Sequence, residues 1–483
     1  MERILDDVEP KLVFKYFEDL TRIPRDSGNE EMVCEYLFQF AQSHGFEYYK
    51  DEAKNVLLKV PATKGYENKP VVIIQGHMDM VCEKNEGTSH DFTREPISFE
   101  VEDDKIIAKE TTLGADDGIG IAFALALAAD ETACHPPLEI VCTSDEERGM
   151  TGAEAFDTGL LKGRTLVNLD ADDEGIFIAG SAGGPVIRIE IPIVKEKAVD
   201  GMKALHISVK GLMGGHSGED IHRGRANANK LLNRILAAVG REVAYSLSDI
   251  SGGLKYNAIP REASAVIYVG ENDIKKTVDI VNKMEGAFKA EYYSTEPGLY
   301  VTAGIIKGNG TTLNEDSKNR INDFIMFSEC GIIRMHAELE GVESSVSVGT
   351  VRLEGDNAVI LTMTRSSVES IYMDTYYKVI RLAEMMGGTT EIMSNCPEWE
   401  FNPKSKIIDL FSSVYEELFC KKAKILVLHA GLECGVIGKK IPEYVDMIAA
   451  GPDIRNLHTV GEYVTISSVQ KFWKLFKEVF KRL

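Results

Sequence analysis

Short apolar runs, each followed by histidine or acidic residues, are the feature that most constrains how this chain can fold. Val71–Ile74 is wholly apolar and β-branched, which is typical of a strand buried on both faces. Leu138–Cys142 and Thr165–Leu169 also have strand-like character. Glu30–Ser43 has helical spacing, and Leu113–Ala129 has the pattern of a loop that leads into an apolar helix. Strands that alternate with helices predict a parallel α/β sheet in the first third of the chain.

The pattern changes after Gly183-Gly184-Pro185. From there to about residue 396, half-exposed strand patterns mix with helical ones, and buried α/β patterning then returns up to a closing amphipathic helix at 469–483. We expect strands at 186–194, 205–209, 331–339, 343–351, 358–364, 425–428 and 445–449, and helices at 226–239, 275–292 and 373–386. The prediction is a mixed α/β fold with a largely parallel sheet, built from residues 1–185 and 397–483, into which an α+β domain of residues 186–396 is inserted.

Composition excludes several classes of protein. The chain has 483 residues and a formal net charge of −22, so it lacks the basic surface of a nucleic-acid binder or a polybasic membrane protein. Its longest apolar run, Ile119–Ala129, is too short to span a bilayer. Eight scattered cysteines without a CxxC pair favour reduced thiols over a disulfide framework. The acidic start of the chain is unlike a signal peptide, and we expect a cytoplasmic protein.

Five loops place histidine or carboxylate groups where ligands bind in such a sheet, beyond the carboxyl ends of its strands. His77 with Asp79, the pair Glu146-Glu147, and Asp170 follow the three early strands, Asp116 precedes an apolar helix, and His458 follows the last strand. Singly these signals are weak, because an Asp before a helix is usually a cap and exposed acidic pairs are usually solvated. Together they form the ligand set of a two-metal site for Zn²⁺, Co²⁺ or Mn²⁺.

Longer motifs carry a resemblance to a known family. The chain resembles the M20 family of metallopeptidases, and within it the aminoacyl-histidine (Xaa-His) dipeptidase branch, nearly from end to end. The matching segments are Gly76–Cys82, Leu113–Gly118, Ser144–Gly149, Asn168–Asp170, Gly214–His222, Asn257–Arg261, Arg365–Ser367, Ala430–Gly435 and Gly451–His458. The resemblance implies a zinc-peptidase-like catalytic domain, and it identifies the inserted domain as a lid and dimerisation domain.

The resemblance also assigns the metal ligands. Two divalent ions per subunit are expected, Zn²⁺ first, with Co²⁺ or Mn²⁺ as alternatives. His77 and Asp170 would bind one ion, Glu147 and His458 the other, and Asp116 both. Asp79 would orient His77, the usual partner of a ligating imidazole.

The catalytic and substrate-binding groups follow in the same way. Glu146 would be the general base, since a base must reach the attacking water without being consumed as a ligand; an exchange of the Glu146 and Glu147 roles is the alternative. His216 would stabilise the oxyanion, in its own subunit or across a dimer. Arg365 would hold the substrate's terminal carboxylate. Asn257, Gly431 and Glu433 would complete the substrate site, with the role of Glu433, toward the substrate amine, left open.

The implied activity is a metal-dependent dipeptidase, acting on small unblocked dipeptides of the Xaa-His type, in a homodimer formed through the lid domain. Neither nucleic acid nor a membrane is expected as a partner. Another M20 hydrolase, such as an aminoacylase or a tripeptidase, would use the same metals and base and differ in the pocket. A binding protein that kept the fold without the chemistry is disfavoured by the intact ligand positions, and a two-metal phosphoesterase by the acidity of the metal loops.

Overall fold

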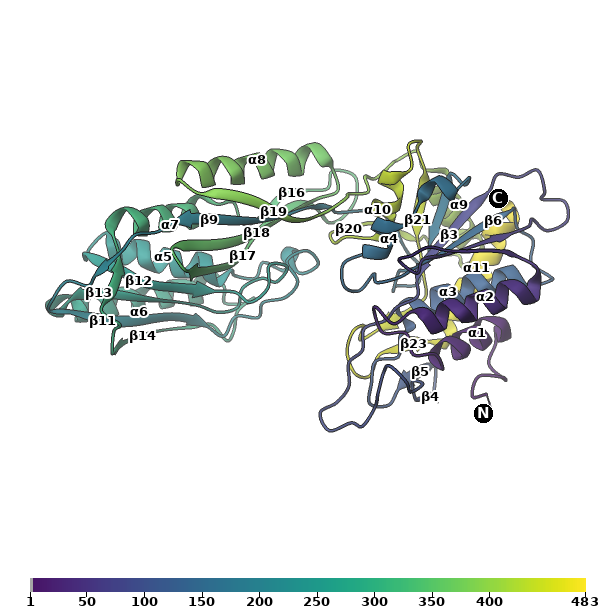
Figure 1. Cartoon of the computed structure of the whole chain (residues 1–483), viewed down its shortest axis with the longest axis horizontal. Coiled ribbons are helices and arrows are strands. Elements are labelled where there is room, and N and C mark those ends of the chain that lie inside the picture. Colours follow the sequence, from purple (N-terminus) through teal and green to yellow (C-terminus); the bar gives the residue numbers. More distant parts are fainter. Residues whose placement is uncertain (1–2) are drawn as a thin grey trace. The chain divides into compact units, whose positions relative to one another are not determined.

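An eight-stranded sheet organises one of the two compact units of the chain, and the computed structural model describes residues 3–483 (Figure 1). This unit, called unit 1, comprises residues up to Gly180, Phe401–Leu426 and Leu432–Leu483. In spatial order its strands are β1 (Glu47–Lys50), β2 (Val56–Val60), β6 (Leu138–Thr143), β3 (Val72–His77), β7 (Thr165–Asn168), β21 (Asp446–Ala449), β8 (Ile176–Ser181) and β20 (Lys424–Leu428).

The centre of this sheet is parallel. β3 pairs in parallel with β6 and β7, and β7 pairs in parallel with β21, whereas β1, β2 and β8 pair antiparallel. The register sets His77 of β3 beside Thr143 of β6. The loops after these two strands therefore leave the sheet at one edge, and the expected mixed, largely parallel sheet is confirmed.

Helices and a small antiparallel sheet complete unit 1. Helix α3 is apolar on nearly every side and is buried throughout its first thirteen residues, as expected for a helix in the core. Its Phe123 ring lies 4.9 Å from that of Phe472 in the amphipathic helix α11. The helices are α1 (Lys11–Thr21), α2 (Glu31–His44), α3 (Ala115–Ala129), α4 (Thr151–Ala155), η1 (Thr158–Leu160), α9 (Lys406–Phe419), α10 (Glu433–Lys440) and α11 (Ile466–Arg482), and the small sheet runs β22 (Ile454–Arg455), β23 (Tyr463–Thr465), β5 (Lys105–Ala108) and β4 (Phe99–Glu102).

Unit 2 comprises Ser181–Glu400 and Val427–Gly431 and is built on a nine-stranded antiparallel sheet. Eight strands follow the order β14 (Tyr300–Ile306), β11 (Met202–Lys210), β13 (Ala263–Gly270), β12 (Tyr245–Gly252), β17 (Val342–Glu354), β18 (Asn357–Ser366), β9 (Gly184–Pro192) and β19 (Thr389–Cys396), and β16 (Gly331–Met335) pairs with β17. The remaining elements are α5 (Ala228–Gly240), α6 (Ile274–Glu291), α7 (Glu315–Phe327), α8 (Glu369–Met385), η2 (Ile221–Arg223), η3 (Glu271–Asp273) and the pair β10 (Lys195–Lys197) and β15 (Thr311–Leu313).

Four α-helices that the sequence patterns did not predict are α4, α7, α9 and α10, and α7 and α9 are the longest of them. Each of these two begins with a side-chain cap: Asn314 accepts a hydrogen bond from the Ser317 N–H at 2.9 Å, and Ser405 accepts one from the Ile408 N–H at 3.2 Å. The apolar stripe of α7 is confined to its second half, which weakens the periodic signal. The domain boundaries expected at 185/186 and 396/397 stay predictions. In the described part of the chain, no helix is long and apolar enough to cross a membrane.

Candidate active site

Asp116 lies between two histidines in unit 1. Its Oδ1 is 2.8 Å from Nε2 of His77, and its Oδ2 is 3.0 Å from Nε2 of His458. His77 is the last residue of β3, Asp116 is in the first turn of α3, and His458 follows β22. Three segments that are far apart in the sequence thus converge on one carboxylate, and each of its oxygens faces a different imidazole.

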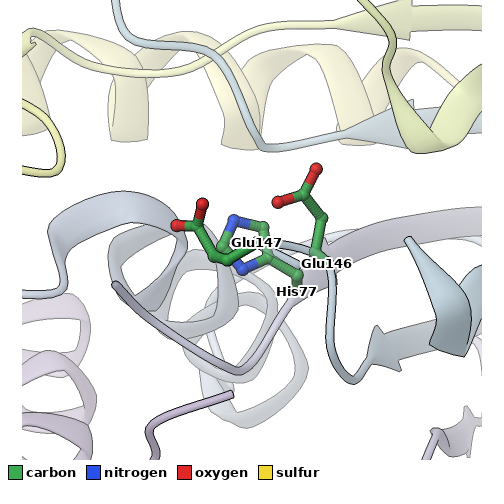
Figure 2. Close-up of side chains that lie close together, drawn as sticks. All are labelled: His77, Glu146 and Glu147. Atoms are coloured by element: carbon green, nitrogen blue, oxygen red, sulfur yellow. The ribbon is translucent and has the colours of Figure 1, made fainter. Parts of the chain in front are cut away.

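The other predicted ligands lie around this carboxylate. Glu147 Oε2 is 3.1 Å from Nε2 of His458. In the close-up, the Glu146 and Glu147 carboxylates lie on either side of the His77 ring (Figure 2). Three of these residues at a time bring ligand atoms within 4.8 Å of one another: His77, Asp116 and Asp170; Asp116, Glu147 and His458; and His77, Glu146 and Glu147. Glu30, Asp79 and Asp145 form a further group of this kind.

Asp79 fixes two parts of the site at once. Its Oδ1 lies 3.5 Å from Nδ1 of His77, which also lies 3.2 Å from the Asp79 carbonyl oxygen, so that Nε2 faces Asp116. The same carboxylate accepts hydrogen bonds from the backbone N–H groups of Glu146 at 3.0 Å and Glu147 at 3.3 Å, and from the Ser27 hydroxyl at 2.7 Å. Asp79 therefore orients the imidazole and also holds the loop that carries both glutamates.

The carboxylates of this site shift the pKa values of the two histidines upward. Hydrogen bonds to Asp116 and Glu147 raise the pKa of His458 to about 11. Burial alone would lower the pKa of His77, but hydrogen bonds to Asp116 and Asp79 raise it well above its ordinary value. Burial raises the pKa of Asp116, but its hydrogen bonds to His458 and His77 outweigh burial and lower it. The carboxylates of the site thus favour positive charge at their neighbours, and divalent cations would supply it.

Several carboxyl groups are harder to ionise than usual in this environment, Glu146 and Asp170 among them. Burial raises the pKa of Glu146 well above its ordinary value, with added repulsion from Glu433 and Glu147. Burial likewise raises the pKa of Asp170, and the charge of Asp116 adds to this effect. A carboxylate with a raised pKa is a stronger proton acceptor, as a general base requires.

Glu433 belongs to a buried network of hydrogen-bonded polar side chains in unit 1. Its Oε2 accepts hydrogen bonds from Gln75 Nε2 at 2.5 Å and from the Thr143 hydroxyl at 2.6 Å, and Gln75 Oε1 accepts one from Asn168 Nδ2 at 2.6 Å. Burial raises the pKa of Glu433 to about 7, although the charge of His77 opposes this. The other oxygen, Oε1, is buried without a hydrogen-bond partner among the described residues. The sequence alone leaves the role of Glu433 open.

The donor set fits a pair of divalent cations. It consists of imidazole nitrogens and carboxylate oxygens, the ligands that Zn²⁺, Co²⁺ and Mn²⁺ accept in proteins. Glu147 Oε1 is buried and has no hydrogen-bond partner among the described residues, which is costly for a carboxylate unless a cation or water meets it. Asp116 presents one oxygen to each of the two histidines, an arrangement that would suit a carboxylate shared by two ions.

A second cluster of predicted residues lies in unit 2. His216 Nδ1 accepts a hydrogen bond from the Glu219 N–H at 3.2 Å, which places the proton of the neutral ring on Nε2. That Nε2 lies 3.2 Å from Nη2 of Arg365. Burial, together with the charge of Arg365, lowers the pKa of His216, and burial lowers the pKa of Arg365 to about 10. Among the described residues no carboxylate pairs with this guanidinium, and its Nε is buried without a hydrogen-bond partner.

Asn257 belongs to the same cluster through its backbone, and the segment that ends at Gly431 approaches it at His429. The Asn257 carbonyl oxygen accepts a hydrogen bond from the Ser217 N–H at 2.8 Å, next to His216. Gly218 packs so tightly that a Cβ there would overlap the carbonyl oxygen of His429, two residues before Gly431. A glycine at position 218 is therefore needed to bring the His216 loop against the 427–431 segment.

Sequence reasoning missed two buried residues that shape these clusters. His429 Nε2 lies 2.7 Å from the Ser345 hydroxyl, and burial lowers its pKa to about 3, with further lowering by the charge of Arg365. Arg25 is 1% exposed and donates hydrogen bonds to the carbonyl oxygens of Met78 and Asp79, both at 3.0 Å. Neither residue lies in a chemical motif, so nothing in the sequence separates it from an ordinary core or surface residue.

Comparison with known proteins identifies the class. Residues 73–482 match Peptidase family M20/M25/M40, and the chain belongs to this family. The predicted family and enzyme class, a hydrolase acting on peptide bonds, are confirmed.

Individual relatives are similar over the whole chain. The cytosol non-specific dipeptidase of Escherichia coli (strain K12) is 36% identical over 480 residues, which are 99% of each chain. The crystal structure of aminoacylhistidine dipeptidase from Vibrio alginolyticus superimposes with a TM-score of 0.91 at 35% identity, covering 99% of this chain and 98% of that one. The aminopeptidase PepT of Bacillus cereus, at 14% identity and a TM-score of 0.56 over 98% of each chain, shares the fold.

Proposed function

We propose that this protein is a metal-dependent dipeptidase that hydrolyses dipeptides with free amino and carboxyl ends, including dipeptides that end in histidine. Two relatives that match it nearly end to end are named as dipeptidases, one non-specific and one acting on aminoacyl-histidine. The observation that carries the proposal is the position of Asp116 between His77 and His458.

The same residues define where metal would be held. His77 and Asp170 would bind one divalent ion, Glu147 and His458 the other, and Asp116 both. When bound, the ions polarise the scissile carbonyl group and lower the pKa of water. Zn²⁺ is our first choice, with Co²⁺ and Mn²⁺ as alternatives, because all three accept this nitrogen and oxygen donor set.

The protein's own groups then move the protons. Glu146 accepts a proton from the attacking water, whose oxygen bonds to the carbonyl carbon, and later passes that proton to the nitrogen of the leaving amine as the C–N bond breaks. Asp79 keeps His77 and the Glu146 loop in place during these steps. The Nε2–H of His216 stabilises the oxyanion that develops on the carbonyl oxygen.

The protein selects dipeptides by binding both charged ends of the substrate. Arg365 binds the terminal carboxylate, because a buried guanidinium without an anionic partner is stabilised by one. Asn257 and Gly431 contribute to the same part of the substrate site, and Glu433 meets the substrate's ammonium group. A peptide one residue longer would place its carboxylate beyond Arg365, which favours dipeptides over tripeptides.

A substrate panel with metal-loaded protein tests this function. Free dipeptides, Xaa-His dipeptides among them, should be hydrolysed far faster than tripeptides, N-acetylated dipeptides and N-acyl amino acids. Faster hydrolysis of N-acyl amino acids or of tripeptides would instead assign the protein to another activity of its family. Binding of dipeptides without hydrolysis by any metal-loaded form would mark it as a binding protein.

We further propose that the protein acts in the cytoplasm as a homodimer formed through unit 2. The relative from Escherichia coli is named as a cytosol enzyme, and the family resemblance implies the dimer. Light scattering on the eluting protein would measure its mass. Mixing His216→Ala and Glu146→Ala subunits would then decide whether His216 acts across the dimer, because only that arrangement restores activity in the mixed species.

A further inference from the structure

One buried carboxylate in unit 1 holds the loop that carries the shared ligand. Glu462 precedes β23 and is 2% exposed. Its Oε2 accepts hydrogen bonds from the backbone N–H groups of Leu113 at 2.8 Å and Gly114 at 3.0 Å. Its Oε1 accepts hydrogen bonds from those of Ala115 at 2.8 Å and Asp116 at 3.3 Å. Four consecutive backbone donors thus converge on a single side chain.

These four donors lie at and just before the start of helix α3. The N–H groups at the start of a helix lack intrahelical acceptors, and α3 begins at Ala115. A carboxylate offers two oxygens, each able to accept two hydrogen bonds, and hydrogen bonds to a charged acceptor are the stronger kind. Glu462 therefore fixes the path of the chain from Leu113 to Asp116.

A second residue ties the same loop to the histidine side of the site. Arg25 donates hydrogen bonds to the carbonyl oxygen of Gly114 and to the carbonyl oxygens of Met78 and Asp79, directly after His77. Gly114 has a φ of +70°, and a Cβ there would meet Arg25 Nη2 at 2.6 Å. Arg25 thus holds the loop at a carbonyl oxygen, and Glu462 holds it at its backbone N–H groups.

Glu462 also connects Asp116 with the segment that carries His458. It lies four residues after His458 in the same segment, while its carboxylate holds the backbone of Asp116. We propose that Glu462 is a positioning residue for the shared ligand, and that its hydrogen bonds keep the Asp116 carboxylate aimed at both metal positions. The inference rests on the metal site of the proposed function and extends it to a residue that contributes no ligand atom.

The test measures metal affinity rather than activity. Glu462→Gln keeps the size of the side chain but replaces one acceptor oxygen with an NH₂ group that faces N–H donors. Competition with a chromophoric chelator gives the affinity of each protein for Zn²⁺ at both positions. We expect Glu462→Gln to weaken both positions by about 10- to 100-fold, the range seen when a group supporting a metal ligand is removed. Glu462→Asp, which keeps the charge but is one methylene shorter, should fall between this variant and the wild type.

Two comparison variants separate this effect from a general one. Glu102→Gln changes an exposed glutamate of β4 and should bind Zn²⁺ like the wild type. Asp170→Asn removes a ligand that contacts one position only, and should weaken one position while the other keeps its affinity. The signature of Glu462 is therefore the joint loss of two ions, with the circular dichroism spectrum of the metal-free protein unchanged.

Wild-type affinity at both positions in Glu462→Gln, or weakening of only one, would overturn the inference. So would failure of both Glu462 variants to fold, because Glu462 would then be needed for the fold as a whole. The proposed function fails separately: a wild type that binds two ions and cleaves no dipeptide refutes the activity and leaves the role of Glu462 standing.

Discussion

Nη2 of Arg365 lies 3.2 Å from Nε2 of His216, although both nitrogens carry hydrogens to donate. With the ring proton on Nε2, this pair is stabilised by an acceptor oxygen that lies within hydrogen-bonding distance of both nitrogens. A peptide substrate brings such oxygens at its carbonyl and carboxylate groups. This pair of residues therefore provides a direct test of how the substrate is held.

Replacing Arg365 with Ala should lower kcat/KM for a free Xaa-His dipeptide, with a loss of transition-state stabilisation of about 2–4 kcal/mol. The reason is that a charge-assisted partner of the carboxylate is lost. The loss should be much smaller for the same dipeptide with an amidated C-terminus. Steady-state kinetics of both proteins on both substrates measures the difference. Equal losses would mean that Arg365 supports the structure of unit 2 and does not bind the carboxylate.

The Glu146→Ala and Glu147→Ala proteins should differ in the number of metal ions that they hold. Glu146→Ala should lose on the order of 10²–10⁴-fold in kcat, the usual contribution of a general base, and keep both ions. Glu147→Ala should lose the ion that it shares with His458, and Asp116→Ala should lose both. Metal analysis of the purified proteins is the measurement. An empty site in Glu146→Ala with a full one in Glu147→Ala would exchange the two roles.

Removal of metal should abolish hydrolysis. Exhaustive chelation leaves the carboxylates around Asp116 without the charge that they attract, and addition of Zn²⁺, Co²⁺ or Mn²⁺ should restore activity to different extents. Activity assays after dialysis, with metal content determined on the same samples, follow both steps. Full activity in protein shown to be metal-free would contradict the two-metal proposal.

Glu433→Gln should raise KM for a free dipeptide by roughly tenfold or more, because the charged partner proposed for the ammonium group is lost. The amide keeps an oxygen to accept the Gln75 and Thr143 hydrogen bonds, so the buried network is retained. The inhibition constants of two inhibitors that differ only in N-acetylation, determined for both proteins, measure this effect. Equal weakening of both inhibitors would show that Glu433 acts only within the network.

His429 should make stability depend on pH below neutrality. Its pKa is lowered to about 3 in the folded protein by burial and by the charges of Arg365, His216 and His222, against an ordinary value of 6.5. The unfolded chain therefore binds more protons below pH 6.5, and folding loses stability as the pH falls from 6.5 toward 3. Between pH 7 and pH 5 this amounts to about 2 kcal/mol for one histidine.

The comparison with His429→Gln isolates that contribution. Urea unfolding of the metal-free proteins at pH 7 and pH 5 should show a smaller decrease in the free energy of unfolding for the variant, since glutamine does not titrate. The Ser345 hydroxyl can still pair with the amide, which limits the change at pH 7. Identical pH dependence in both proteins would show that His429 has the same pKa in the folded and the unfolded state.

The sequence alone determined the class of fold and most of the candidate site. Buried β-branched runs such as that ending at Ile74 can be satisfied only within a covered sheet, and the polar loops that follow them must emerge at its carboxyl edge. His77, Asp116, Glu147, Asp170 and His458 were predicted in this way together with the family resemblance, and the fold gathers their ligand atoms.

The tertiary structure alone decided what supports these residues. Glu462 is separated from Asp116 by hundreds of residues, and Arg25 and His429 lie outside every chemical motif, so no local pattern marks them. Their importance comes from burial, because a buried charge or donor must find a partner, and only the folded chain determines which groups are buried together. Periodicity and motif spacing act over a few residues, whereas these partnerships join segments that become neighbours only when the sheet forms.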